Sequence, residues 1–133
     1  MMFQYQSEIQ KVIDGDTYVI DIDLGLGVWV RGERIRLYGV DTPEVYGVKR
    51  TSEEYQLGKA SSDFAKSLVK KGTLAIVETI KDEKGKYGRY LAVLYIRVPE
   101  DILAGHDQIR AIADFYCLND LLIAKGLAEP YML

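Results

Sequence analysis

The sequence predicts a mainly β protein: a five-stranded barrel with two or three packed helices, which give it some α+β character. Three observations lead to this prediction. Short apolar runs bounded by turn residues recur along the chain, as β-strands do. A helical pattern separates the third predicted strand from the fourth. A second helical pattern follows the last strand. This order of elements matches the OB-fold, a small barrel of five strands.

The first three strands are expected in the N-terminal third of the chain. Residues 9–14 and 17–23 form two apolar runs, and the second places Tyr18, Ile20 and Ile22 on one face. The glycine between the two runs favours a tight turn. Residues 28–40 are predicted as a third strand or as a bent pair of strands.

A long helix is expected after these strands. The segment Thr51-Ser52-Glu53-Glu54 resembles a capping box. Apolar and small residues then recur at helical spacing as far as Val69, and Gly72 ends the helix. Gly58 lies inside this helix, where glycine costs about 1 kcal/mol relative to alanine. We therefore expect Gly58 to have a packing reason.

The C-terminal half is predicted to contain two further barrel strands, an excursion and a final helix. The expected ranges are 73–80 and 90–96 for the barrel strands, 97–112 for an excursion with a short helix of its own, 115–117 for a returning strand, and 121–125 for a helix opened near Asn119 and ended by Gly126.

Length and composition fit one ordinary globular domain. The 133 residues are 48% hydrophobic and 28% charged. No apolar run approaches the roughly 20 residues that span a bilayer, and the N-terminus lacks the features of a signal peptide. A single cysteine, Cys117, excludes an intrachain disulfide. The compartment is left open: intracellular, phage-encoded or a matured secreted form. The net charge of −3 argues mildly against a passive nucleic-acid binder.

Two short acidic motifs, Asp14-Gly15-Asp16-Thr17 and Asp41-Thr42-Pro43-Glu44, each adjoin a predicted strand. Carboxylate oxygens at strand ends are the hard ligands that divalent cations such as Ca²⁺ prefer. Arg36 lies in the strand before the second motif, and an arginine beside a cation can bind phosphate with fork-like hydrogen bonds. The combination predicts phosphoryl chemistry.

Each motif also has a structural interpretation. The first motif alone fits a hairpin turn, and the second fits a helix N-terminus with Pro43 as its first residue. Arg36 alone fits an exposed strand residue, and Tyr87-Gly88-Arg89 fits a turn. All these interpretations would have to hold together, which makes the joint structural explanation the weaker one. The only histidine, His106, has the surroundings of a solvated loop residue, so a histidine-based mechanism is not expected.

Four segments in order resemble the staphylococcal nuclease (thermonuclease, micrococcal nuclease) family: residues 12–17, 35–44, 86–92 and 118–128. The resemblance implies an OB-fold enzyme that hydrolyses phosphodiester bonds of DNA and RNA with Ca²⁺ and leaves 3′-phosphates. We expect a single domain of this type over residues 1–133. Relative to the best-known member, it would lack the long C-terminal helix and carry an insertion around residues 96–114.

The resemblance also implies a role for each site residue. The implied roles are Asp16 and Asp41 as direct Ca²⁺ ligands with the backbone carbonyl of Thr42, Asp14 and Glu44 around the ion through water, Glu44 as candidate base, Arg36 and Arg89 as phosphate-binding catalytic arginines, Lys86 and Tyr87 against a terminal phosphate, and Tyr131 against the nucleotide.

The function predicted from the sequence is therefore that of a calcium-dependent endonuclease acting by metal-assisted attack of water on phosphorus. Its expected partners are DNA or RNA, with no membrane, and it is expected to be a monomer. The alternative is a non-catalytic OB-fold module that binds nucleic acid or protein. A third hypothesis is a nuclease that is inactive until a partner replaces the missing helix. The charged positions of the motifs are all filled, which favours an enzyme. DNA versus RNA preference and internal versus end cutting stay open.

Overall fold

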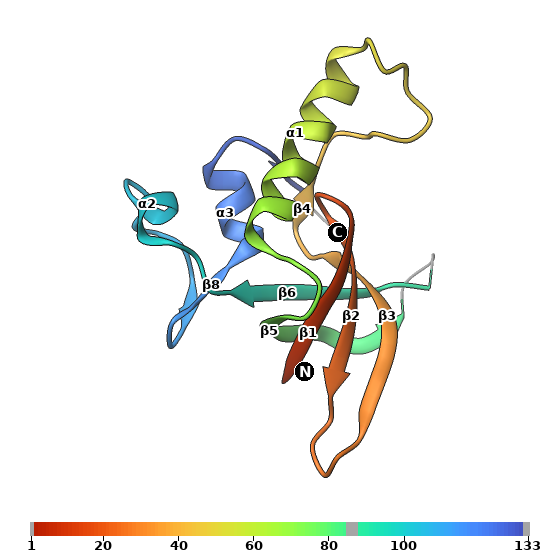
Figure 1. Cartoon of the computed structure of the whole chain (residues 1–133), viewed down its shortest axis with the longest axis vertical. Helices are drawn as coiled ribbons and strands as arrows, with labels where there is room; N and C mark the ends of the chain where they lie inside the picture. The colour runs from red at the N-terminus through yellow and green to blue at the C-terminus, as the bar shows by residue number, and fades with distance from the viewer. Residues whose placement is uncertain (1, 85–87, 132–133) are drawn as a thin grey trace.

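Five long strands close into a barrel. The computed structural model describes the backbone of residues 2–84 and 88–131, and the side chains of residues 3–80 and 88–131. The barrel strands are β1 (Met2–Asp14), β2 (Thr17–Asp23), β3 (Trp29–Leu37), β5 (Thr73–Lys84) and β6 (Tyr90–Ile96). They are ordered β3-β2-β1-β5-β6, and a parallel pairing of β3 with β6 closes the ring (Figure 1). The predicted five-stranded OB-fold barrel is confirmed.

The strand β1 is longer than the sequence pattern indicated, because it starts at Met2 rather than at residue 9. Residues 2–9 pair with β5 and residues 6–14 pair with β2, so residues 6–9 have a partner strand on both sides. A register shift between Ile9 and Lys11 in the pairing with β2 comes where the pairing with β5 ends. Residues 6–8 are polar, which weakens the apolar alternation that would have revealed this part of the strand.

The described part of the chain contains three helices: α1 (Glu53–Leu68), α2 (Glu100–Leu103) and α3 (Leu118–Ala124). The capping signal for α1 was displaced by one residue. The pattern indicated a capping box from Thr51 to Glu54, whereas Ser52 caps the helix and its Oγ accepts a hydrogen bond from the Tyr55 N–H at 3.1 Å. The helix α3 starts three residues before the expected range of 121–125. Cys117, close to the expected Asn119, caps it, and its sulfur accepts from the Asp120 N–H at 3.4 Å. No helix within the described ranges is long and apolar enough to cross a membrane.

Within the described residues, four short strands accompany the barrel: β4 (Val40–Asp41), β7 (Ala111–Ile112), β8 (Phe115–Cys117) and β9 (Glu129–Pro130). Of the two alternatives expected for residues 28–40, the single third strand is the correct one, because β3 continues through Arg31-Gly32, where a bent pair would have been broken. The chain turns from β3 into β4 at Gly39, which has a φ of 75°. β4 pairs with β9 in a separate small sheet. The excursion returns through β8, which pairs with β6.

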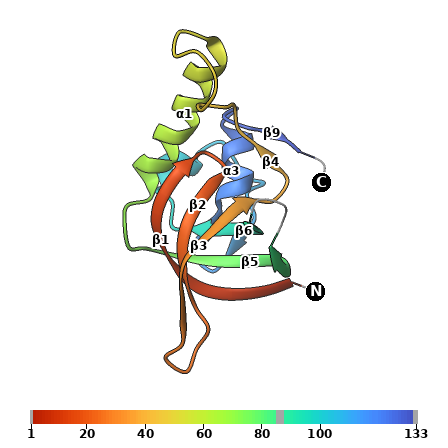
Figure 2. The ribbon, with the colours of Figure 1, turned by 90° about the vertical axis from the view of Figure 1, so that its right-hand side faces the viewer.

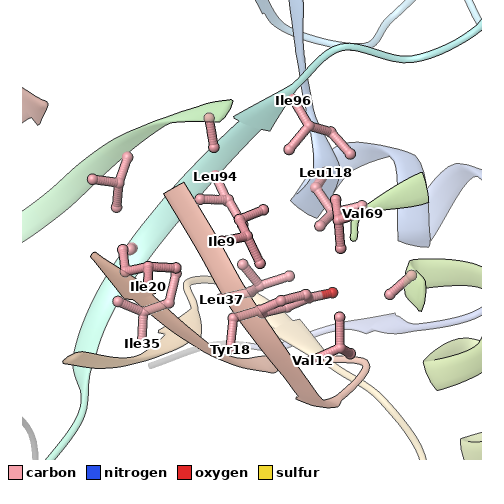
Figure 3. Packing of buried hydrophobic residues seen from close by; sticks show 14 of the residues in the cluster. Ile9, Val12, Tyr18, Ile20, Ile35, Leu37, Val69, Leu94, Ile96 and Leu118 are labelled. Atoms are coloured by element: carbon pink, nitrogen blue, oxygen red, sulfur yellow. The ribbon is translucent and has the colours of Figure 1, made fainter. Parts of the chain in front are cut away.

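The core fills the barrel and continues under two helices. Tyr18 and Ile20 from β2 are completely buried and Ile22 nearly so, which confirms the predicted face of that strand. In Figure 3 these barrel side chains converge with Leu118 from α3 and with Val69, which follows α1. The hydroxyl of Tyr18 donates to the carbonyl of Gly15 at 2.9 Å. The buried Tyr18 thus connects the core directly to the β1–β2 turn through this hydrogen bond.

Candidate active site

One rim of the barrel carries the charged residues of both sequence motifs. The β1–β2 turn holds the first motif, and β4 begins the second. Thr17 is the register partner of Arg36 across β2 and β3, and Arg36 is the partner of Leu91 across β3 and β6. Arg89 immediately precedes β6. Strand pairing thus places these residues at one edge of the barrel, and in Figure 1 the β1–β2 turn and β4 lie beside α1.

Asp16 is the most firmly held carboxylate of this rim. It is only 8% exposed. One carboxylate oxygen, Oδ2, accepts from the Thr42 N–H at 3.2 Å, and the other, Oδ1, accepts from the Thr17 hydroxyl at 3.1 Å. The backbone carbonyl of Asp16 accepts from the Leu37 N–H at 2.9 Å. These bonds fix Asp16 between the first motif, the end of β3 and the second motif.

The guanidinium of Arg36 lies between two carboxylates. Its Nη2 is 3.3 Å from Oδ1 of Asp41 and 3.7 Å from Oδ2 of Asp16. The Arg36 side chain is 15% exposed, whereas that of Asp41 is 50% exposed. The guanidinium also lies over the ring of Tyr131, 5.1 Å from the ring centroid. Arg36 therefore joins both acidic motifs and Tyr131.

Arg89 reaches the same cluster through a hydroxyl. Its Nη1 donates to the Oγ1 of Thr17 at 3.2 Å, and that hydroxyl donates to Asp16. The two arginines thus stand on either side of Asp16. Both guanidinium groups are permanently cationic forks of hydrogen-bond donors, which suits them to the oxygens of a phosphate group.

Asp14 adds a further carboxylate behind the turn. Its Oδ1 accepts from the backbone N–H of Asp16 at 3.2 Å. Burial, together with the neighbouring Asp16 carboxyl, raises the pKa of Asp14 to about 7, and the charge of Glu44 acts in the same direction. The carboxyl groups of this turn are therefore so close together, and so poorly hydrated, that Asp14 holds its proton to a higher pH than an exposed aspartate.

Glu44 lies on an exposed loop whose backbone packs against α1. A Cβ added to Gly58 of α1 would lie 2.5 Å from the carbonyl oxygen of Pro43 and 2.9 Å from that of Glu44. The expectation of a packing reason for Gly58 is thereby confirmed. A Cβ on Gly15 would lie 2.7 Å from Cγ2 of Thr42. Two glycines thus allow the second motif to approach both the helix and the first motif.

The remaining predicted residues divide into two groups. Tyr131 joins the site: its N–H donates to the carbonyl of Gly39 at 2.9 Å, next to the β4–β9 pairing seen in Figure 2. Lys86 and Tyr87 lie outside the described residues. Their predicted contact with a terminal phosphate stays a prediction.

Asn119 is a residue whose role the sequence reasoning missed. It is buried, its Oδ1 accepts from the Leu94 N–H at 3.0 Å, and its Nδ2 donates to the carbonyls of Tyr38 and Ala92 at 3.0 and 3.2 Å. It therefore ties α3 to β6 and to the turn that leads into β4. The available signal was an amide within an apolar run, Cys117 to Ile123, broken only by Asn119 and Asp120.

The donor set on the rim suits a hard divalent cation. Two carboxylates, from Asp16 and Asp41, lie within 3.7 Å of one nitrogen, and the N–H of Thr42 donates to Asp16 between the motifs. Ca²⁺ prefers carboxylate oxygen ligands and tolerates irregular geometry. Among the described side chains, no group of three or more His, Cys, Asp or Glu converges on a metal position.

Fold and site together define an OB-fold domain whose rim combines carboxylates with two arginines. The family model described as "Staphylococcal nuclease homologue" matches residues 34–133. The chain belongs to the staphylococcal nuclease family. The match begins within β3, so the first acidic motif lies outside it.

Three similar proteins illustrate the family relationship. A thermonuclease of Staphylococcus intermedius is 40% identical over 88 residues, which cover 66% of this chain and 47% of that protein. An uncharacterized protein of Methanocaldococcus jannaschii is 31% identical over 120 residues, 79% of this chain and 55% of its own length. The endonuclease YhcR of Bacillus subtilis is 34% identical over 91 residues, 66% of this chain and 7% of that protein. The chain spans about half the length of the first two.

Proposed function

We propose that this chain is a calcium-dependent nuclease that hydrolyses phosphodiester bonds of DNA and RNA. The observation that carries the proposal is the position of Arg36 between Asp16 and Asp41, with Arg89 linked to Asp16 through Thr17. Carboxylates for a cation and arginines for a phosphate thus occur on one rim. The thermonucleases and the endonuclease among the similar proteins support the same reaction class.

Asp16, Asp41 and the carbonyl of Thr42 are the residues that would hold the cation. When bound, Ca²⁺ would supply positive charge for a phosphate oxygen and make a nearby water more acidic. The hydrogen bonds from Thr42 and Thr17 orient the Asp16 carboxylate in advance. Asp14, whose Oδ1 accepts from the N–H of Asp16, would act on the ion through water rather than by direct contact.

Arg36 and Arg89 bind the oxygens of the scissile phosphate. Charge grows on these oxygens as the bond to the attacking water forms, and donors placed in advance stabilise that charge. Arg36 exchanges its 3.3 Å contact with Asp41 for contact with phosphate, because Asp41 then serves the cation. Arginines in this role contribute roughly 10³–10⁵-fold to the rate in well-studied phosphoryl transfer.

Glu44 is the candidate general base. Its carboxylate is exposed to water on a loop fixed by the packing of Gly58. It accepts a proton from water while the water oxygen bonds to phosphorus. The bond from phosphorus to the 5′-oxygen breaks, and this oxygen takes a proton from solvent. The products are a 3′-phosphate and a 5′-hydroxyl.

The proposal is tested by incubating plasmid, single-stranded DNA and RNA with Ca²⁺, Mg²⁺ or a chelator. We expect cleavage with Ca²⁺ and none with the chelator, and end-group analysis should find 3′-phosphates. Calorimetric titration with Ca²⁺ gives a separate readout, in which Asp16→Asn should bind the ion more weakly than the wild type. Robust cleavage in chelator would contradict the proposed function. Binding of nucleic acid without cleavage under any condition would support the non-catalytic module instead.

A further inference from the structure

A groove runs along one side of α1, between this helix and the loop of residues 45–50. It encloses about 310 Å³. We call it the α1 groove and define it by its polar and aromatic residues: Tyr46, Arg50, Tyr55, Lys59, Asp63 and Lys66. The residues from α1 recur at spacings of three and four, so they lie on one face of the helix. None of the site residues described above belongs to this face of α1.

The α1 groove is positively charged. Three cationic side chains and one carboxylate line it, which leaves a net charge of +2. The Nζ of Lys59 pairs with Oδ2 of Asp63 at 2.8 Å. Arg50 and Lys66 are exposed and form no ion pair with any described residue. Two cations are therefore available to phosphate groups.

A second groove, which includes Asp41 and Thr42 of the site itself, has the opposite charge. It encloses about 450 Å³ between the start of α1, β4 and residues 126–129. Beyond Asp41, three further carboxylates line it, from Glu53, Glu54 and Glu129, and none of its lining residues is a lysine or arginine. A polyanion that extends from the site is repelled by these three carboxylates and attracted by the α1 groove.

The α1 groove begins next to the active site along the chain. Ile13 and Val45 line the groove, and they are the chain neighbours of Asp14 and Glu44. A strand that leaves the second motif along the loop of residues 45–50 reaches the groove within a few residues of Glu44. From Tyr55 to Lys66 the helix rises by about 16 Å, which matches several nucleotides at about 3.4 Å each in a stacked strand.

The same groove offers surfaces for bases. The side chain of Tyr46 is 68% exposed, and Tyr55 is half-buried beside it in the lining. Proteins that hold single strands without sequence preference combine a basic track with aromatic rings on which bases stack. Both components are present here.

We propose that the α1 groove binds the continuation of a single-stranded polynucleotide whose scissile phosphate lies at the active site. Arg50 and Lys66 contact backbone phosphates, and Tyr46 stacks on a base. This inference rests on the proposed nuclease function. It predicts that long single strands bind more tightly than dinucleotides, and that the difference resides in the groove rather than in the catalytic rim.

The experiment measures binding by fluorescence anisotropy in chelator, so that no substrate is cleaved. The probes are labelled oligothymidylates, one a dinucleotide and one of about twelve nucleotides, within the 4–16 nucleotide range of OB-fold sites. The test variant is Arg50→Ala/Lys66→Ala. The matched control is Lys71→Ala/Lys125→Ala, which removes the same charge at positions outside the groove. Thermal melting of both variants checks folding.

We expect the test variant to bind the longer probe about tenfold more weakly at low salt. Its slope of log affinity against log salt should be smaller by about 1.4, because two cations at about 0.7 each no longer release counterions. The affinity of the test variant for the dinucleotide should stay within twofold of the wild-type affinity. The control variant should bind both probes within twofold of the wild type. Tyr46→Ala should weaken the longer probe about tenfold without changing the slope, and Tyr46→Phe should restore binding.

The outcomes separate this inference from the function on which it rests. If the wild type cleaves nucleic acid but the test variant keeps the wild-type affinity and salt slope, the α1 groove is not the binding site and the nuclease proposal stands. If the control variant loses as much as the test variant, the effect is one of net charge and the groove proposal is overturned. If the wild type neither binds nor cleaves any probe, both proposals fail.

Discussion

The two acidic motifs of the active site are held in place by different means. The barrel side consists of Asp16, Arg36 and Arg89, which lie on or next to paired strands and are joined by hydrogen bonds and ion pairs. The loop side consists of Asp41 and Glu44, which are exposed. Its position depends on two close approaches of backbone to glycine and on one hydrogen bond from Thr42 to Asp16. Strand pairing therefore fixes the side chains of the barrel side, whereas packing against glycine fixes the backbone of the loop side.

The largest expected effect is on the barrel side. Arg36→Ala should lower kcat roughly 10³–10⁵-fold, because the growing charge on phosphate loses its principal donor. Single-turnover cleavage of a fluorescent oligonucleotide measures this loss. Arg34→Ala is the matched control in the same strand and should stay near the wild-type rate. A loss below tenfold in Arg36→Ala would show that this arginine serves the carboxylates rather than the substrate.

A somewhat smaller loss is expected from the chemistry of the loop side. Glu44→Gln should lower kcat about 10²–10⁴-fold, since the amide cannot accept the proton from water. Single-turnover cleavage of the same oligonucleotide measures this loss. Glu100→Gln in α2 controls for the loss of an exposed carboxylate. If Glu44→Gln keeps the wild-type rate, the base is another group.

The packing of the loop side is tested without touching its chemistry. Gly58→Ala places a methyl group 2.5 Å from the Pro43 carbonyl, so the loop that carries Glu44 must shift. A displacement of about 1 Å can cost on the order of 10²-fold in rate. Stability should change little or fall, because strain of about 1–3 kcal/mol opposes a gain in helix propensity of about 1 kcal/mol.

Ala60→Gly, at an exposed position of the same helix, is the matched control, because it should change stability but not the rate. It should lose about 1 kcal/mol of stability with an unchanged rate. Urea unfolding and kcat measured on both variants separate the two effects. A Gly58→Ala protein with the wild-type rate would mean that the loop position does not control the chemistry.

The smallest effect on rate is expected where the two sides join. Asn119→Ala leaves the Leu94 N–H and the carbonyls of Tyr38 and Ala92 without this partner. Unsatisfied buried groups of this kind should cost about 2–4 kcal/mol of unfolding free energy, while kcat of the folded protein changes less than tenfold. Urea unfolding measures the loss, with Gln108→Ala as an exposed amide control. Unchanged stability would show that water replaces Asn119.

Local sequence patterns predicted the elements well where one face is buried. The alternation around Tyr18 predicted the face of β2 that the core buries, and the capping pattern predicted the start of α1 to within one residue. The closure of β3 on β6 and the pairing of β4 with β9 depend on residues distant in the chain, which periodicity does not detect. Gly58 illustrates the difference between what a local pattern predicts and what only the fold shows. Its cost in a helix predicted a packing reason, but only the fold identifies the Pro43 carbonyl as its neighbour.

Two kinds of signal pointed to the candidate site. Asp16 and Arg36 stand out because charged residues adjoin apolar strand patterns, whereas Arg89 was implied by the family resemblance. Strand pairing then places the three residues at one rim. Asn119 was overlooked because an amide at a helix start has an ordinary local explanation in capping. Its actual partners belong to Tyr38, Ala92 and Leu94, and nothing in the local pattern names them.

The small sheet of β4 and β9 has a consequence for biosynthesis. Asp41 is paired with Glu129, and Gly39 accepts a hydrogen bond from the N–H of Tyr131. A ribosome makes the chain from its N-terminus, and domains fold as they emerge. The strand that begins the second motif therefore has its hydrogen-bond partner only after residues 129–131 leave the ribosome. Until then the barrel can form around its core while the loop side lacks this support, so the two sides of the site are completed at different times.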